Sequence, residues 1–252
     1  MSEVFAKRGE RKANIRRYLT DEQRSMAKNT PKDGRFELMS TLSRANEMKS
    51  NLPVTNLWEI ERELVRSGIR TICGVDEAGR GPLAGPVYAA AVILPLDLDI
   101  PELNDSKKLS ADKRNRVFDL VINAATAYGV AFADHKEIDA LNILNATYLA
   151  MNRAIEMLEV IPDIALIDGN RNSGITFKSR CIVKGDSKSA SIAAASVLAK
   201  VSRDRYMEEL AKKYPNYAFE KHKGYGTKLH YAKLEQHGIS DIHRRSFLKL
   251  KK

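Results

Sequence analysis

Five short apolar runs restrict the possible folds more than any other feature of this sequence. Each is long enough for one buried β-strand and is bounded by polar or turn-forming residues; they lie at residues 70–76, 87–94, 127–133, 163–167 and 175–183. Elsewhere apolar residues recur every three or four positions, which predicts helices at residues 57–68, 111–121, 140–159 and 189–212. Strands that come first and then alternate with helices indicate an α/β fold, with helices packed against a mixed sheet.

The composition is that of an ordinary soluble, folded protein. The 252 residues are 43% hydrophobic and 29% charged, which excludes a wholly disordered or collagen-like chain. No apolar run approaches the ~18 residues of a membrane span, and the charged N-terminal stretch lacks a secretory signal. The two cysteines, Cys73 and Cys181, are too few for a disulfide framework and lack a zinc-binding spacing. We therefore expect a cytoplasmic protein.

The net charge of +10 is concentrated at the two ends of the chain. Residues 1–70 carry 15 basic and 10 acidic side chains, residues 71–213 carry 18 and 19, and residues 214–252 carry 9 and 3. Basic segments around a near-neutral core are typical of proteins that bind a phosphate backbone, although solvated surface lysines give the same pattern. We expect a polar extension over residues 1–55, partly helical or disordered, and then a globular domain over residues 56–213 with a basic C-terminal helical segment after it.

Four acidic residues lie where predicted strands end and loops begin: Asp76, Glu77, Asp168 and Asp186. The carboxyl ends of neighbouring strands converge in space, and converging carboxylates repel one another unless a cation lies among them. Magnesium and manganese prefer oxygen ligands and bind carboxylates together with phosphate oxygens. The pattern therefore indicates metal-assisted chemistry on a phosphate ester.

Each acid also has a purely structural interpretation. Asp168 precedes a glycine, which is a common turn signal, and Asp186 could cap the helix that follows it. Asp76 and Glu77 are harder to explain in this way, because a buried strand does not normally hold an acid on either face. Adjacent strand residues face opposite sides, so we hypothesise that a tight turn at Gly79 rotates Glu77 towards the side of Asp76.

A glycine loop, residues 79–86, follows the first acidic pair, and its backbone N–H groups can approach phosphate or hydroxyl oxygens closely. The whole string GVDEAGRGPLAGPV (74–87) is more specific, and four further blocks follow it in order: NDSKKLS (104–110), LIDGN (166–170), KGDSKSASIAAAS (184–196) and HKGYGT (222–227). With these blocks, over roughly residues 57–250, the chain resembles ribonuclease HII, the type 2 ribonuclease H of bacteria. The resemblance implies a ribonuclease H-like mixed β-sheet flanked by helices, with a small C-terminal helical segment that completes the substrate cleft.

By this resemblance, the four acids form a catalytic site for two divalent ions, Mn²⁺ or Mg²⁺. One ion activates a water for in-line attack on the phosphodiester and the other stabilises the leaving oxygen, so that 3′-hydroxyl and 5′-phosphate ends result. Gly79, Arg80 and Gly81 match the segment that senses the ribose 2′-hydroxyl, the group that distinguishes RNA from DNA. Tyr225 matches the tyrosine that packs on the sugar next to the ribonucleotide.

Three residues of the second block, Lys107, Lys108 and Ser110, are placed for phosphate contact. A turn that opens the helix at residues 111–121 explains this block equally well.

Four of the five histidines lie in the basic C-terminal segment, at His222, His230, His237 and His243. Their spacing is irregular and no cysteine accompanies them, which argues against zinc. We expect them to contact phosphate or solvent.

The leading hypothesis is a monomeric endonuclease that binds RNA–DNA hybrids and cuts their RNA strand. It would also cut on the 5′ side of ribonucleotides embedded in duplex DNA and so serve their removal. Ribonuclease HIII is the nearest enzyme alternative, and it differs from the Gly-Arg-Gly sequence at residues 79–81. An inactive nucleic-acid-binding protein of the same fold would have replaced an acid, whereas all four are present, and a basic RNA scaffold would leave the acids unexplained.

Overall fold

The computed structural model describes residues 57–103 and 109–248. Five strands form one sheet in the order β3-β2-β1-β4-β5. The strands are β1 (Ile72–Ala78), β2 (Val87–Ile93), β3 (Ala127–Ala133), β4 (Ile164–Asp168) and β5 (Ser179–Ile182). β1, β2 and β3 pair antiparallel, whereas β4 and β5 extend the sheet in parallel from the other edge of β1. The predicted mixed sheet of an α/β fold is confirmed.

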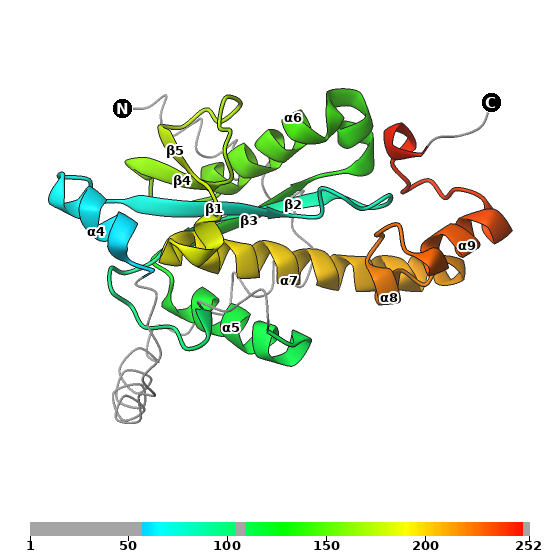
Figure 1. Ribbon diagram of the computed structural model, residues 1–252, viewed down its shortest axis with the longest axis horizontal. Helices are drawn as coiled ribbons and strands as arrows, with labels where there is room; N and C mark the ends of the chain where they lie inside the picture. The colour runs from blue at the N-terminus through cyan, green and yellow to red at the C-terminus, as the bar shows by residue number, and fades with distance from the viewer. Residues whose placement is uncertain (1–56, 104–108, 249–252) are drawn as a thin grey trace, which may run out of the picture. The chain divides into compact units, whose positions relative to one another are not determined.

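Two long helices cover the two faces of this sheet (Figure 1). α6 (His135–Glu156) packs on β2 and β3, and α7 (Ala190–Lys213) packs on β1 and β2 from the opposite side, with α5 (Ala111–Ala124) against its outer surface. The other helical elements are short: α4 (Glu59–Arg66), η3 (Gly185–Ser187), η4 (Pro215–Tyr217), α8 (Phe219–His222), α9 (Lys228–His237) and η5 (Arg245–Phe247). Each sheet face therefore has its own apolar core.

Small residues allow α7 to pack closely on the sheet. Its buried alanines include Ala193, Ala194, Ala195 and Ala199. Gly74 of β1 lies against the backbone of Ser191 and Ile192, and a Cβ at this glycine would overlap both residues. This close approach fixes the separation between α7 and β1.

The predicted helices and strands are present, but some of their ends differ. α6 begins at His135 rather than at residue 140, because Asp134 and Glu137 form a reciprocal capping box at its N-terminus. Asn142 interrupts α6 with a φ of 67°, and its side chain accepts the N–H of Leu144, so the helix restarts there. Local capping therefore sets these boundaries, and the apolar spacing alone does not show them.

Some predictions fall outside the described residues. They concern the N-terminal extension over residues 1–55 and the phosphate-contact residues Lys107 and Lys108. Within residues 57–103 and 109–248, no helix combines the length and apolarity that crossing a membrane requires.

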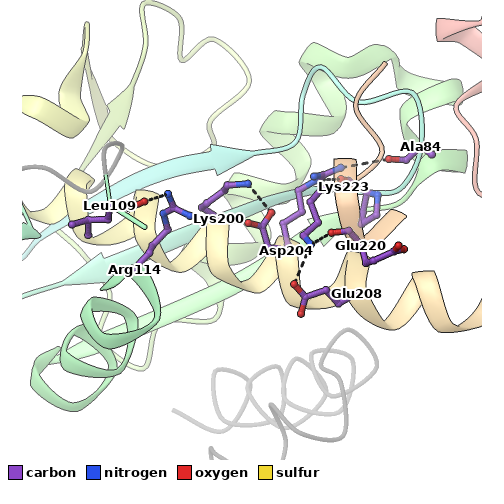
Figure 2. A network of polar contacts seen from close by, with 10 residues as sticks. Ala84, Leu109, Arg114, Lys200, Asp204, Glu208, Glu220 and Lys223 are labelled. Atoms are coloured by element: carbon purple, nitrogen blue, oxygen red, sulfur yellow. Dashed lines mark hydrogen bonds and ion pairs between the residues drawn. The ribbon is translucent and has the colours of Figure 1, made fainter. Parts of the chain in front are cut away.

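The C-terminal segment is joined to the glycine loop by backbone hydrogen bonds. The N–H of Leu83 donates to the carbonyl of Gly224, and the N–H of Arg244 donates to the carbonyl of Leu83, both at 2.8 Å. Figure 2 shows a further link, in which Lys223 forms an ion pair with Glu208 of α7 at 3.1 Å. The loop, the end of α7 and the C-terminal segment therefore support one another.

Candidate active site

Two of the four predicted acids, Asp76 and Asp168, lie at the same level of adjacent strands. β1 and β4 run parallel, and their register pairs Val75 with Ile167, so Asp76 and Asp168 each directly follow a paired residue. Asp76 is only 5% exposed, and the next residue, Glu77, is partly buried. The sheet topology thus brings together acids that are far apart in the sequence.

Hydrogen bonds hold both aspartates in place. Asp76 Oδ1 accepts the N–H of Glu77 at 2.7 Å, and the Ser196 hydroxyl on α7 also bonds the Asp76 carboxyl group. Asp168 Oδ1 accepts the N–H of Gly185 at 2.7 Å. This bond ties the end of β4 to η3, so Asp168 does more than shape its own turn.

Burial and neighbouring charges perturb two carboxyl groups of this cluster, those of Asp76 and Glu77. Burial is the largest cause for Asp76, whose pKa lies well above its ordinary value, and the charges of Glu77 and Asp168 raise it further. Burial also raises the pKa of Glu77, although Arg80, 3.2 Å from its Oε1, favours the charged form. Like charges held this close cost free energy unless a cation or a proton offsets them.

Glu77 reaches this cluster without leaving its strand. It stays opposite Ala89 in the pairing of β1 with β2, and the turn marked by the φ of 93° at Gly79 begins only after Ala78. The hypothesis that a tight turn rotates Glu77 towards the side of Asp76 is therefore wrong.

Asp186 is buried in η3, next to the glycine that binds Asp168. The cap of α7 is Ser189, whose hydroxyl accepts the N–H of Ile192 at 3.2 Å. The cap interpretation of Asp186 is therefore wrong.

The oxygen donors of this region suit a hard divalent cation in chemical type. In the described part of the chain, however, no group of three or more His, Cys, Asp or Glu side chains is arranged so that it could hold a metal ion. Glu77 is engaged by Arg80, and a cation would have to compete with that guanidinium for its carboxylate. The carboxylate oxygens, and the like charges that raise the pKa of Asp76, fit a cation, and the metal-ligand assignment stays a prediction.

Two buried arginines hold the glycine loop through its carbonyl groups. Arg244 donates to three of them, those of Gly79 at 2.6 Å, Arg80 at 2.9 Å and Gly85 at 2.8 Å. Arg203, on α7, donates to the carbonyls of Pro86 at 3.1 Å and Ala84 at 3.4 Å; Ala84 is labelled in Figure 2. A Cβ at Gly79 would overlap the Arg203 side chain, so this position requires glycine for its contact as well as for its φ.

Tyr225 lies beside the glycine loop, and 43% of its surface is exposed. The Arg203 guanidinium carbon is 5.7 Å from the centre of its ring, and a Cβ at Gly81 would lie 3.7 Å from its Cε1. The structure thus brings the exposed tyrosine next to the Gly-Arg-Gly segment, although the two are far apart in the sequence.

Ser110 has a local structural contact. It is the N-cap of α5, and its hydroxyl accepts the N–H of Lys113 at 3.4 Å. Its contact with phosphate stays a prediction.

Three of the C-terminal histidines, His222, His230 and His243, are buried, so the expectation that they contact phosphate or solvent is wrong. The N–H of Ser240 can only donate to Nδ1 of His243, and the carbonyl of Tyr225 can only accept from Nδ1 of His230. His243 Nε2–H therefore donates to His230 Nε2, 3.0 Å away. Burial, followed by the charge of His230, lowers the pKa of His243 to about 4.

Sequence reasoning missed three residues that support the site: Ser196, Arg203 and Arg244. Two of them had a signal. Ser196 follows a run of three alanines, and Arg203 lies seven positions later, hence on the same face of α7. Arg244 had none, because it is one of two adjacent arginines in a basic segment and only the fold distinguishes it from the exposed Arg245.

Comparisons with known proteins identify the family of this chain. The family model described as ribonuclease HII matches residues 73–250. A curated ribonuclease HII from Caldicellulosiruptor bescii is 57% identical over 194 residues, which cover 77% of this chain and 94% of the relative.

Solved structures share the fold. The ribonuclease H2 from Pyrococcus horikoshii OT3 matches with a TM-score of 0.59 and 27% identity, over 70% of this chain and 93% of that one. Bst-RNase HIII, solved in complex with Mn²⁺, matches with a TM-score of 0.53 over 77% of this chain and 69% of that one; at 19% identity it shows the fold alone. The chain belongs to the ribonuclease HII family and is a type 2 ribonuclease H, an endoribonuclease of RNA–DNA hybrids.

Proposed function

We propose that this enzyme also cuts duplex DNA on the 5′ side of a single embedded ribonucleotide, and leaves 3′-hydroxyl and 5′-phosphate ends. The observation that carries the proposal is the continuity of the site: Asp76 and Glu77 lead directly into the glycine loop, and Tyr225 lies beside that loop. A substrate bound on this surface can then have its scissile phosphate next to the acids and the adjoining ribose next to the loop. Such an activity serves the removal of misincorporated ribonucleotides from DNA.

The proposed catalytic groups are Asp76, Glu77, Asp168 and Asp186, which would hold Mn²⁺ or Mg²⁺. Divalent cations held there would supply an activated water and would offset the charge on the leaving oxygen. The Mn²⁺ complex of Bst-RNase HIII, a protein of the same fold, supports this choice of ion. The Ser196 hydroxyl and the Glu77 N–H would orient the Asp76 carboxylate for such a cation.

The proposed recognition groups are Gly79, Arg80, Gly81 and Tyr225, together with Ser110 and the two lysines of its block. Arg80 and Gly81 are exposed, and their backbone N–H groups can meet a ribose hydroxyl or a phosphate oxygen. The exposed ring of Tyr225 can pack on the adjoining nucleotide.

The test uses an end-labelled DNA duplex with one ribonucleotide and a matched all-deoxy duplex. Each is incubated with magnesium, with manganese or with chelator, in the presence of the wild type, Asp76→Asn or Asp97→Asn. Asp97 is the control because it is an exposed aspartate that pairs with Arg62. We expect metal-dependent cutting on the 5′ side of the ribonucleotide by the wild type and Asp97→Asn, and none by Asp76→Asn.

Two other outcomes would contradict parts of the proposal. If the enzyme cuts only long hybrids, the result would agree with the proposed hydrolytic site. It would contradict the proposed role of Tyr225 and the glycine loop at a single ribonucleotide. Binding of the duplex without any cutting would favour an inactive binding protein.

A second variant tests the tyrosine. Replacing Tyr225 with alanine should weaken binding of the single-ribonucleotide duplex by ~1–3 kcal/mol, the usual worth of one aromatic–base contact. Tyr225→Phe keeps the ring and should bind like the wild type. Equal affinities for all three proteins, measured by fluorescence anisotropy in chelator, would exclude a ring contact.

A further inference from the structure

We infer that Arg203 and Arg244 are positioning residues for ribonucleotide recognition: they set the shape in which the glycine loop meets the ribose. The inference rests on the proposed recognition role of that loop. Neither arginine faces the substrate side itself, because they are 1% and 0% exposed, respectively.

The hydrogen bonds of Arg244 fix the direction of two exposed N–H groups. Its guanidinium binds the carbonyls of Gly79 and Arg80. In a trans peptide unit the carbonyl of one residue and the N–H of the next point in opposite directions. With these two carbonyls directed at the buried arginine, the N–H groups of Arg80 and Gly81 must point away from it. In the described part of the protein, neither N–H donates to another protein group, so both are available to a ligand.

Arg203 joins the two halves of the proposed recognition surface. It donates to carbonyls at the far end of the loop, at Ala84 and Pro86, and it also lies near the ring of Tyr225. A shift of this guanidinium would therefore move the loop and the tyrosine together.

The pair also explains why this loop keeps one shape although it is rich in glycine. Within the described ranges, neither guanidinium forms an ion pair with a carboxylate, so loop carbonyls supply the compensation for both buried charges. Releasing the loop would leave two buried cations without partners, which costs far more than the loss of an exposed hydrogen bond.

Lysine cannot replace either arginine in this role. An ammonium group is a compact donor, whereas the planar guanidinium reaches several acceptors at fixed angles. Arg244→Lys should lose at least one of the three loop contacts and leave its carbonyl free to turn, while the positive charge remains. The variant therefore separates loop geometry from charge.

The experiment measures discrimination between two duplexes. Fluorescence anisotropy in chelator gives the affinity of each protein for a DNA duplex with one ribonucleotide and for the matched all-deoxy duplex, and the ratio of the two affinities reports recognition of the ribose. For Arg244→Lys we expect this ratio to fall by about tenfold, as for one or two lost hydrogen bonds. Arg203→Lys should lower this ratio less, because Arg203 binds the loop at Ala84 and Pro86, several residues after Arg80 and Gly81.

Arg205→Lys is the matched control. Arg205 lies on α7 two positions after Arg203; it donates to Asn115 and its guanidinium lies over the ring of Phe118 of α5. In the part of the chain that the structure describes, its hydrogen bonds do not reach the loop. Melting temperatures of all variants separate a loss of folding from a loss of recognition, and Arg203→Lys provides a second test if Arg244→Lys does not fold.

The outcomes are distinguishable. A wild type that binds both duplexes equally would overturn the proposed role of the loop, and the present inference with it. A wild type that discriminates, with folded arginine variants that keep its ratio, would overturn the inference alone. A lower ratio in the two loop variants, with the wild-type ratio in Arg205→Lys, is the result that we expect.

Discussion

The acidic cluster and the arginine-held loop both bury like charges, but they compensate them in opposite ways. Arg203 and Arg244 direct five hydrogen bonds at carbonyl oxygens of the glycine loop. Among the described residues, Asp76 receives the Glu77 N–H and the Ser196 hydroxyl, while burial and then the charges of Glu77 and Asp168 raise its pKa. The two arginine charges are therefore compensated by carbonyl oxygens of the glycine loop, whereas the carboxylates around Asp76 repel one another.

This difference separates a structural use of charge from a functional one. A buried charge that the protein itself compensates rigidifies the chain around it, as in the glycine loop. A buried charge that remains uncompensated lowers stability and favours any cation or proton that can offset it. The contrast can be tested from both sides.

The largest effect is expected from removing charge in the acidic cluster. Asp76→Asn keeps the size of the side chain and its acceptor oxygen but loses a ligand for a cation. We expect a loss of several kcal/mol of transition-state stabilisation, or roughly a thousandfold in kcat. The same variant should melt at a higher temperature than the wild type in chelator, because one of the repelling charges is gone. A lower melting temperature would show that the acids do not repel one another significantly.

The next effect comes from disturbing the arginine-held loop. Gly79 and Gly68 both have a φ of 93°, but only at Gly79 would a Cβ overlap another residue, Arg203. Gly68→Ala should therefore cost only the ~1–2 kcal/mol of the backbone conformation. Gly79→Ala should cost ~1–3 kcal/mol more, as for an overpacked core. Urea unfolding of both variants measures the difference, and equal losses would mean that Arg203 yields freely.

A smaller effect on kcat is expected from removing a hydrogen bond within the acidic cluster. Ser196→Ala removes one of the two hydrogen bonds that orient Asp76, so we expect about 1 kcal/mol, or roughly a fivefold decrease in kcat. KM should stay the same, because the Ser196 hydroxyl contacts the Asp76 carboxyl group. Ser202→Ala, at another buried serine of α7, is the control. Equal kcat values for both variants would exclude a role of Ser196 in orienting Asp76.

The smallest effect concerns the histidines that support Tyr225 from within the C-terminal segment. The pKa values of His222, His230 and His243 all lie below the ordinary value of 6.5, with burial as the largest cause. The unfolded chain then binds more protons, so their contribution to stability is present above pH 6.5 and is lost as the pH falls towards about 4, the pKa of His243.

Unfolding free energies between pH 4 and 7 check this dependence. Asp241 opposes the shift of His243, and His222 and His230 increase it. His243→Gln should flatten the dependence, whereas the exposed His237→Gln should keep it. The same slope in all three proteins would assign the acid sensitivity to other groups.

The sequence predicted the elements of the fold and the main acids, because strand and helix periodicity is local and an acid in a buried strand is conspicuous. Asp76 and Asp168 could be grouped in advance because parallel strands end at one edge of a sheet. The arginine pair could not, since its contacts join the glycine loop to Arg203 and Arg244, far along the chain. The buried histidines were misjudged for the same reason: a basic segment suggests a surface, and only packing against Phe219 and its neighbours shows otherwise.

The seven-residue interval between Ser196 and Arg203 on α7 determines how far apart their two contacts lie. Ser196 orients the acid at the end of β1, and Arg203 anchors the loop that follows it. Seven residues advance an α-helix by about 10.5 Å and return the side chain to nearly the same face. One residue inserted between them would turn Arg203 by about 100° away from the loop while the helix remained intact. Substitutions along this part of α7 can therefore be tolerated where changes in its length cannot, because the distance between the Asp76 carboxyl group and the glycine loop depends on the pitch of this helix.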